Sequence, residues 1–196
     1  MPLRERISSE EVNALPMRAY EGEIILIDSL KDVEAAVLEI SQYSVVGFDT
    51  ESRPAFTKGE SYPISLLQFA TPQKAYLFRI NLIGMPSQVN KLLSNPKLIK
   101  LGIALHDDVK DLRKLGVVNP SGFKDIHSLI KDKGVVNTGL RKLAAMILGF
   151  RISKSQQTSN WENEVLNERQ QVYAATDAWV CLAIYDKLME LRLINV

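Results

Sequence analysis

The chain of 196 residues is long enough for one domain with a substantial core, and its hydrophobic fraction of 46% and charged fraction of 24% are those of an ordinary globular protein. Its single cysteine, Cys181, excludes a disulfide within the chain, and two histidines with that cysteine exclude a zinc cluster of these residues. The net charge of +1 does not by itself indicate a nucleic-acid-binding protein. Because no apolar run would span a bilayer and the first residues lack a signal-peptide core, we expect no membrane association and a reducing cytoplasm.

The first segments predict an arm, a strand and a helix. Residues 1–22 are polar and mixed, so we expect an N-terminal arm, with a short helix after its Ser-Ser pair, ahead of a domain over 23–196. Residues 23–28 (EIILID) form an apolar run that predicts a buried strand. Ser29 followed by Asp32 predicts a capping box at the start of a helix whose apolar residues recur at helical spacing.

The next segments predict a strand, a loop and a hairpin. The stretch VVGFDTES opens as a strand that we expect to end at Asp49. Residues 52–63 hold two prolines and a glycine, which is typical of a long loop. The stretches ISLLQFA and KAYLFRI stand on either side of Thr71 and Pro72, a turn signal, and predict a hairpin.

The second half of the chain has a helical pattern interrupted by one strand. The expected elements are a short helix at 86–94, a strand at 97–105, a helix at 107–115 before Gly116, an amphipathic helix at 138–149 that ends at Gly149, and a long helix from Glu168 to Leu191 capped by Asn167 with Gln170. Strands therefore come first, then a strand–helix unit, then helices. This order predicts a single α/β domain in which a mixed sheet is covered by helices.

Charge is unevenly distributed along these elements. Residues 91–157 carry 13 Lys and Arg against 5 Asp and Glu, whereas the remaining residues carry 11 against 18. A basic middle beside an acidic remainder is consistent with a phosphate-facing surface around an acidic metal site. Charge alone favours equally a solvated helical surface rich in lysine.

Two carboxylates stand at the end of the strand VVGF. Asp49 and Glu51 are i, i+2, a spacing that points both side chains to the same face of a strand. Like charges held together repel and raise each other's pKa unless a cation or a proton lies between them. The pair therefore suggests a metal site.

Two later segments carry further polar groups. Asp107, Asp108 and Asp111 open the helix that follows the central strand, where the helix dipole favours acidic residues without any function. Tyr173 and Asp177 are i, i+4 on the last helix and share one face, as many pairs on surface helices do. Neither segment identifies a site by itself.

Taken together and in this order, the motifs resemble the DEDD superfamily of 3′–5′ exonucleases, and in particular its tyrosine-containing branch, to which the Werner syndrome exonuclease domain and ribonuclease D belong. The matching residues are Asp49, Thr50 and Glu51 for the first motif, Asp108 for the second, and Tyr173 and Asp177 in YAATDA for the third. The SNW stretch at 159–161 strengthens the Werner-like version. The resemblance covers residues 23–191 and implies a ribonuclease-H-like fold.

The second motif has two candidate residues. The strand before it aligns best with Asp108, and Asp107 is the alternative. A shift of one residue on a helix turns the side chain by about 100°, so only one of the two would face the other motifs.

The resemblance implies a cofactor of two divalent metal ions, Mg²⁺ or Mn²⁺, held by Asp49, Glu51, Asp108 and Asp177. Hard oxygen ligands suit these ions better than cysteine or histidine would. Asp49 would bridge the two ions, Glu51 and Asp177 would complete one site, and Asp108 would support the second. Tyr173 would orient the attacking water.

Four further residues are candidate contacts to nucleic acid: Thr50, Arg53, Phe56 and His106. Phe56 would stack on the terminal base, because aromatic stacking tolerates any sequence. The alternative for Phe56 is packing beneath its own loop. Arg53 would reach a phosphate or else be solvated, and His106 would touch the substrate or else be structural.

Three functional interpretations follow from the sequence. The first is a metal-dependent 3′–5′ exonuclease that releases nucleoside monophosphates from the 3′ end of nucleic acid, with DNA slightly favoured over RNA. The second is a catalytically silent nucleic-acid-binding module of the same fold, against which the presence of all five motif residues argues. The third is a general metal-dependent phosphohydrolase acting on nucleotides, against which YAATDA argues. No motif indicates an obligate protein partner.

Overall fold

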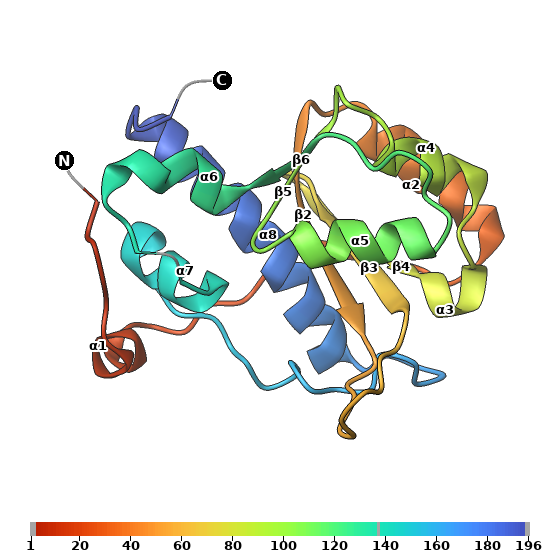
Figure 1. Ribbon diagram of the computed structural model, residues 1–196, viewed down its shortest axis with the longest axis horizontal. Helices are drawn as coiled ribbons and strands as arrows, with labels where there is room; N and C mark the ends of the chain where they lie inside the picture. The colour runs from red at the N-terminus through yellow and green to blue at the C-terminus, as the bar shows by residue number, and fades with distance from the viewer. Residues whose placement is uncertain (1–2, 137, 195–196) are drawn as a thin grey trace.

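A six-stranded mixed sheet forms the centre of the protein (Figure 1). A mixed sheet is what the sequence predicts, but the strand at residues 123–125 is not among those expected. The computed structural model describes residues 3–136 and 138–194. Across the sheet the strands stand in the order β1-β4-β3-β2-β5-β6. Their bounds are β1 Glu23–Ile27, β2 Val45–Ser52, β3 Ile64–Ala70, β4 Lys74–Arg79, β5 Ile99–Gly102 and β6 Phe123–Asp125. β2, β3 and β4 pair antiparallel, whereas β1 is parallel to β4, and β5 is parallel to both β2 and β6.

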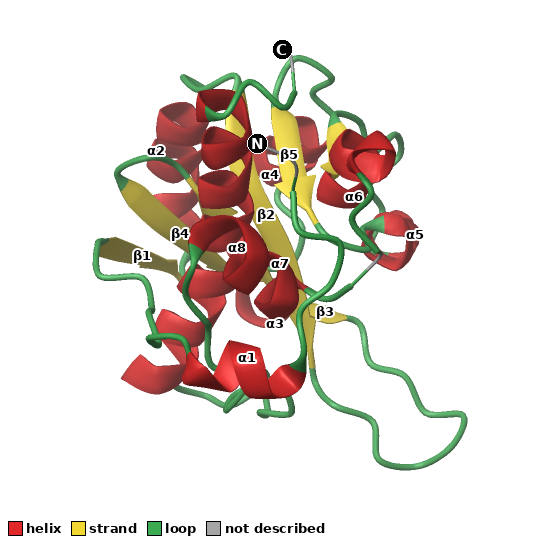
Figure 2. Cartoon of the chain, turned by 90° about the vertical axis from the view of Figure 1, so that its left-hand side faces the viewer, coloured by secondary structure: helices red, strands yellow, loops and turns green. Residues whose placement is uncertain are grey.

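Helices cover both faces of this sheet (Figures 1 and 2). α2 (Leu30–Ile40) and α4 (Ser87–Leu93) lie against one face, and α8 (Glu168–Glu190) lies against the other with α7 (Leu140–Leu148) packed on it. The other helices are α1 Ser9–Ala14, α3 Ile80–Ile83, α5 His106–Lys114, α6 Ile126–Ile130 and the 3₁₀ turn Lys131–Lys133. None of the helices described is long and apolar enough to cross a membrane.

Strand β2 separates two differently built sides of the sheet. Val46 and Phe48 point toward α2 and α4 and are completely buried in the larger hydrophobic core. The alternate residues of β2 face α8. At Gly47 the helix comes so close that an added Cβ would lie 1.9 Å from the carbonyl oxygen of Ala178. α8 therefore rests directly on β2, and the residues after Gly47 lie beneath it.

Several local signals from the sequence are confirmed. Asn167 begins α8 with a full capping box, in which its side chain accepts from the N–H of Gln170 and the Gln170 side chain accepts from the N–H of Asn167. α7 ends at Gly149, whose φ of 75° is the left-handed conformation that glycine adopts without strain. The hairpin between β3 and β4 closes at Thr71, whose side chain accepts from the N–H of Lys74 at 3.0 Å.

Three local expectations are wrong. β1 is an edge strand in which only Ile27 is buried, so it is not the buried strand expected. Ser29 begins α2 without any side-chain cap, because the N–H of Asp32 bonds the Ser29 carbonyl oxygen instead, at 3.2 Å. β2 does not end at Asp49 but continues to Ser52, because its last residues stay paired with β3.

The strand expected over 97–105 is cut short by a turn that places α5. β5 ends at Gly102, and Ala104 adopts a left-handed φ of 57°. The N–H of Ala104 donates to Asp125 Oδ2 at 2.7 Å, so the carboxylate at the end of β6 holds this unusual turn. The chain then enters α5 beside the end of β2.

We expect Gly47→Ala to lower the free energy of unfolding by at least about 1–3 kcal/mol, the usual cost of overpacking, because the new methyl group would meet helix backbone. Gly139→Ala is the control, since Gly139 has φ −72° and no atom lies within 4 Å of its added Cβ; we expect it to cost less than about 1 kcal/mol. Urea unfolding measures both. Equal stabilities would show that α8 moves freely off β2.

Candidate active site

The first and third motifs meet across one cavity. Asp49 and Glu51 lie on the face of β2 that α8 covers, and Tyr173 and Asp177, one turn apart on α8, face back toward the strand. All four side chains line a cavity of about 590 Å³. The local spacing within each element thus turns each pair toward the other, and the β2–α8 contact brings the pairs together.

Asp108 joins this group from α5. Its Oδ1 accepts a hydrogen bond from the hydroxyl of Thr50, the residue between the two carboxylates of β2. Asp107 is exposed, and Asp111 is paired with Lys114. The geometry therefore favours Asp108 over its neighbours as the carboxylate of the second motif.

Burial raises the pKa values of the four carboxyl groups, and the charges of neighbouring carboxylates add to the rise for Asp49, Glu51 and Asp108. Burial, then the charges of Asp177 and Asp108, raise the pKa of Asp49 well above its ordinary value. The pKa of Glu51 rises to about 10, chiefly through burial and then through Asp49. Burial raises the pKa of Asp177 to about 7, although its contact with the Tyr173 hydroxyl opposes the rise. The pKa of Asp108 is also raised, mainly by burial. The cluster therefore lacks compensating positive charge.

Divalent metal ions would supply the positive charge that the carboxyl groups lack. The donors are all carboxylate oxygens, which suit hard ions such as Mg²⁺ and Mn²⁺. Among the residues that the structure describes, no three His, Cys, Asp or Glu side chains are already arranged around one point as metal ligands. We therefore expect the carboxylates to turn about their side-chain torsions when ions bind.

The ring of Tyr173 packs beside the ring of Trp161. The two rings lie 6.0 Å apart, centroid to centroid, and Trp161 is completely buried in the core. Burial, and then the charges of Asp177 and Glu51, raise the pKa of the Tyr173 hydroxyl. The phenol therefore keeps its proton at neutral pH and acts as a hydrogen-bond donor.

The four predicted substrate contacts do not gather at one place. Thr50 lies within the acidic cluster, where its hydroxyl bonds Asp108. Arg53 is 3.6 Å from Glu162 and its guanidinium lies over the ring of Tyr62.

Phe56 and His106 stand at the surface. Phe56 is 83% exposed, so the alternative that it packs beneath its loop is wrong. His106 is exposed at the start of α5, two residues before Asp108. Both side chains are accessible to a ligand, and Phe56 is the larger apolar surface.

The same cavity is also lined by basic and polar residues outside the three motifs: Arg141, Lys142, Lys154 and Gln157, with Ser9 and Asn13 of α1. Sequence reasoning missed those of α1 and α7. The basic excess over residues 91–157 includes these cations, but no local pattern separates them from other surface lysines. Only the fold shows which of them face the acidic cluster.

Sequence reasoning also missed Gln68, a buried neighbour of Asp49. Gln68 of β3 stands directly opposite Asp49 of β2 in the antiparallel register, so both side chains lie on the α8 face. Gln68 is completely buried, and neither atom of its amide has a hydrogen-bond partner among the residues described. Its amide therefore remains available to the polar groups of the site.

A protein-family model described as 3′–5′ exonuclease matches residues 24–192. The chain therefore belongs to the 3′–5′ exonuclease family, as the three motifs imply. The matched range holds all five motif residues, and it begins after the N-terminal arm.

Curated relatives and solved structures agree with this family. The chain is similar to the mouse Bifunctional 3′-5′ exonuclease/ATP-dependent helicase WRN, 30% identical with 89% of this chain and 13% of the relative covered. It is 31% identical to the human Exonuclease mut-7 homolog, with 94% and 25% covered. The chain thus spans a quarter or less of these two relatives.

Two solved structures show the same fold. The EXO domain of Aedes aegypti Nibbler has a TM-score of 0.79 and 26% identity, with 92% of this chain and 95% of that chain covered. Escherichia coli RNase D has a TM-score of 0.77 and 22% identity, with 86% and 44% covered. The ribonuclease-H-like fold expected from the sequence is confirmed.

Without metal, we expect stability to fall as pH rises. The folded pKa values of Glu51 and Asp177, about 10 and about 7, lie above their ordinary 4.5 and 3.8. At a pH between the ordinary and the folded pKa of either residue, the folded protein holds a proton that the unfolded chain has released. Rising pH therefore favours unfolding. In EDTA, the Tm at pH 9 should lie below that at pH 6 by at least about 2–4 °C, the shift that 1 kcal/mol produces at this size.

Glu51→Gln tests the cause of that slope. It removes the ionising group and keeps the shape, so we expect a higher Tm at pH 9 and a flatter pH profile in EDTA. Glu60→Gln, at an exposed position in the loop after β2, is the matched control and should leave the profile unchanged. An unaltered slope in Glu51→Gln would mean that Glu51 is already ionised in the folded protein.

Proposed function

We propose that the chain is a metal-dependent 3′–5′ exonuclease that hydrolyses the terminal phosphodiester bond at the 3′ end of nucleic acid and releases nucleoside monophosphates. One observation carries the proposal: the carboxyl groups of Asp49, Glu51 and Asp177, whose pKa values are raised, meet Tyr173 in a cavity that basic residues also line, and Asp108 is joined to them through Thr50. An acidic centre for divalent ions beside a basic wall for phosphates is what such a hydrolysis needs.

Each motif residue has a position that suits one task. The carboxylates of Asp49, Glu51, Asp108 and Asp177 would together hold the divalent ions. When bound, the ions supply a water of lowered pKa and offset charge on the attacking and leaving oxygens. Tyr173, which keeps its proton, would donate a hydrogen bond that orients the water or the scissile phosphate.

We propose nucleic acid with a 3′ end as the substrate, with DNA slightly favoured over RNA. The preference rests on the Werner-like SNW stretch that precedes α8. Escherichia coli RNase D is described as an exoribonuclease involved in structured RNA processing, but at 22% identity that likeness supports the fold alone. A sugar preference rests on contacts to the 2′ position, so matched DNA and RNA substrates decide it.

The alternative is a nucleic-acid-binding module of the same fold without catalysis. Such a module has no need to keep buried carboxyl groups that repel each other, because unpaired buried charge is costly. The raised pKa values of Asp49 and Glu51 therefore favour the enzyme.

We expect Asp49→Asn to reduce hydrolysis of 5′-labelled DNA and RNA oligonucleotides more than ~100-fold, since even the outer partners of metal ligands typically contribute 10–100-fold. The wild type should shorten the oligonucleotides from the 3′ end with Mg²⁺ or Mn²⁺ and not with EDTA. The variant should fold, with an equal or higher Tm in EDTA, because an amide replaces a buried carboxyl group that is costly to ionise there. A metal-dependent ladder of wild-type intensity from Asp49→Asn would overturn the site assignment.

Asp108→Asn and Asp107→Asn form a matched pair for the second motif. The two residues are neighbours of the same type, and only Asp108 reaches the cluster through Thr50. We expect Asp108→Asn to lower kcat by at least ~10-fold and Asp107→Asn to leave it within about twofold. The reverse order would move the second motif to Asp107.

Phe56→Ala tests the predicted base contact. Stacking on an aromatic ring contributes roughly 1–3 kcal/mol per base, so we expect KM for a single-stranded oligonucleotide to rise between about fivefold and 150-fold. The Tm should not change, because Phe56 packs against little of the protein at 83% exposure. Val118→Ala, at 90% exposure before β6, is the control. An unchanged KM for Phe56→Ala would remove this residue from the substrate site.

A further inference from the structure

The N-terminal arm, residues 3–22, is docked on the catalytic domain along its length. Ile7 and Val12 are buried against Ala145 of α7. The N–H of Val136 donates to the carbonyl oxygen of Glu5 at 3.1 Å. The arm is therefore fixed by apolar contacts against α7 and by a backbone hydrogen bond to the segment before α7.

The middle of the arm is tied to the segment after α7. The N–H of Arg18 donates to the Arg151 carbonyl, and the N–H of Arg151 donates to the Pro16 carbonyl, both at 2.9 Å. The Arg151 side chain also donates from Nε to the Leu15 carbonyl at 3.1 Å. These contacts join arm and domain as a short piece of parallel sheet does.

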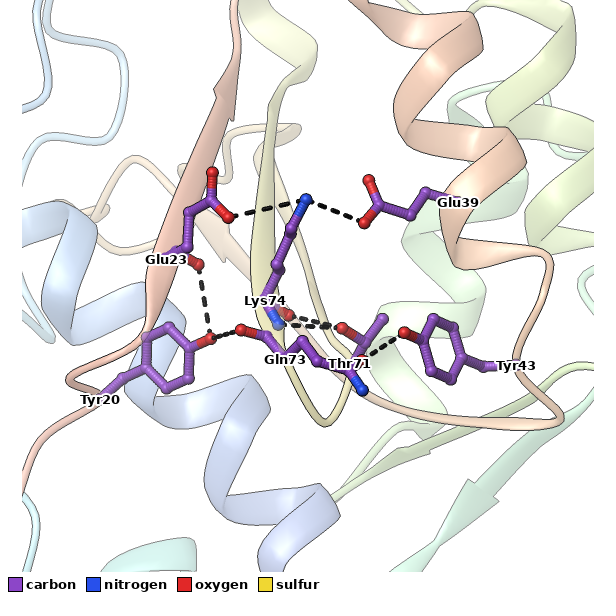
Figure 3. A network of polar contacts seen from close by, with 7 residues as sticks. All are labelled: Tyr20, Glu23, Glu39, Tyr43, Thr71, Gln73 and Lys74. Atoms are coloured by element: carbon purple, nitrogen blue, oxygen red, sulfur yellow. Dashed lines mark hydrogen bonds and ion pairs between the residues drawn. The ribbon is translucent and has the colours of Figure 1, made fainter.

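The end of the arm is anchored beside α8 and the β3–β4 turn. The N–H of Tyr20 donates to the hydroxyl of Thr176, the neighbour of Asp177, at 2.9 Å. The Tyr20 hydroxyl donates to the Gln73 carbonyl at 3.1 Å (Figure 3). In the same network Lys74 lies between two carboxylates, which are those of Glu23 and Glu39 (Figure 3). The arm is thus held at both ends, and α1 is held in place where its residues line the cavity.

The docked arm contributes directly to the cavity that holds the acidic cluster. Ser9, Val12 and Asn13 of α1 line it together with Arg141 and Lys142 of α7. This group of five residues is called the arm wall below. It lies in the same cavity as the carboxylates, and its polar groups are neutral or cationic.

The polar groups of the arm wall are arranged as donors. Arg141 donates from Nη2 to Asn13 Oδ1 at 2.8 Å, which leaves the amide NH₂ of Asn13 unused by that bond. Arg141 Nε is buried and has no hydrogen-bond partner among the residues described. Lys142 adds a second positive charge beside it.

We propose that the arm wall binds the sugar–phosphate backbone of the substrate strand just upstream of its 3′ end. Cationic and amide donors are the groups that contact phosphate and sugar oxygens, and such contacts set the register of a strand. A phosphate would be repelled by the carboxylates unless metal ions cover them, so the basic side of the cavity is where the next phosphates fit. The inference rests on the proposed function, and it assigns a substrate contact to a segment that lies before the residues matched by the family.

The first test measures binding of a 5′-fluorescein-labelled eight-nucleotide single strand, as DNA and as RNA, by fluorescence anisotropy in Ca²⁺ buffer. Asn13→Asp places a negative charge in the arm wall at an exposed position, and we expect Kd to rise about tenfold. Asn119→Asp makes the same change at an exposed position before β6 and should bind like the wild type. Equal Kd values for the two variants would overturn the proposal.

The salt dependence of Kd gives a second, independent readout. Each cation that neutralises a phosphate of a single strand contributes about 0.7 to the slope of log Kd against log salt. We expect Lys142→Gln to lower the slope by about that amount, and Lys91→Gln, at an exposed position of α4, to leave it unchanged. The same slope for Lys142→Gln and the wild type would mean that the arm wall does not contact phosphate.

Hydrolysis in Mn²⁺ separates this inference from the proposed function. The p-nitrophenyl ester of thymidine 5′-monophosphate carries no upstream phosphate, so it reports the catalytic centre alone. In Asn13→Asp, the ratio of kcat/KM for the oligonucleotide to that for the ester should fall about tenfold, and an unchanged ratio contradicts the inference. Binding weakened only in Asn13→Asp, in a protein that hydrolyses neither substrate, would support the arm wall and overturn the exonuclease.

Discussion

The direct contact between α8 and β2 is the constraint on which the site depends. No side chain fits at Gly47, where the carbonyl oxygen of Ala178 occupies the position of a Cβ. Residues two and four places further along β2 must therefore lie in the narrow space beneath the helix. Those residues are Asp49 and Glu51, and Asp177 precedes Ala178 on the helix. Backbone packing thus forces the carboxyl groups together against their repulsion.

The other side of β2 stabilises the sheet against that repulsion. Phe48 is completely buried and its ring lies 5.1 Å from Phe69 and 5.2 Å from Phe123, both in edge-to-face geometry. Because side chains alternate along a strand, the same eight residues hold a hydrophobic core on one face and an acidic centre on the other. Stability and chemistry are therefore divided between two faces, and the acidic face is free to be optimised for ions at some cost in stability.

The cavity also joins two opposite kinds of charge. Its lining includes the carboxylates of β2 and α8, and it also includes Arg141 and Lys142 of α7 with the polar side chains of α1. The basic middle and the acidic remainder of the sequence thus meet in one place. The docked arm, anchored through Tyr20 and Arg151, adds residues of α1 to the lining of this cavity.

The sequence by itself determined the secondary elements that carry the motifs and the way each motif faces, because i, i+2 on a strand and i, i+4 on a helix are local relations. Asp49 with Glu51, and Tyr173 with Asp177, follow from that alone. Only the tertiary structure decided which aspartate of α5 joins them, that the first helix lines their cavity, and that β1 is an edge strand. These depend on contacts between segments far apart in the chain, for which a single sequence carries no local signal.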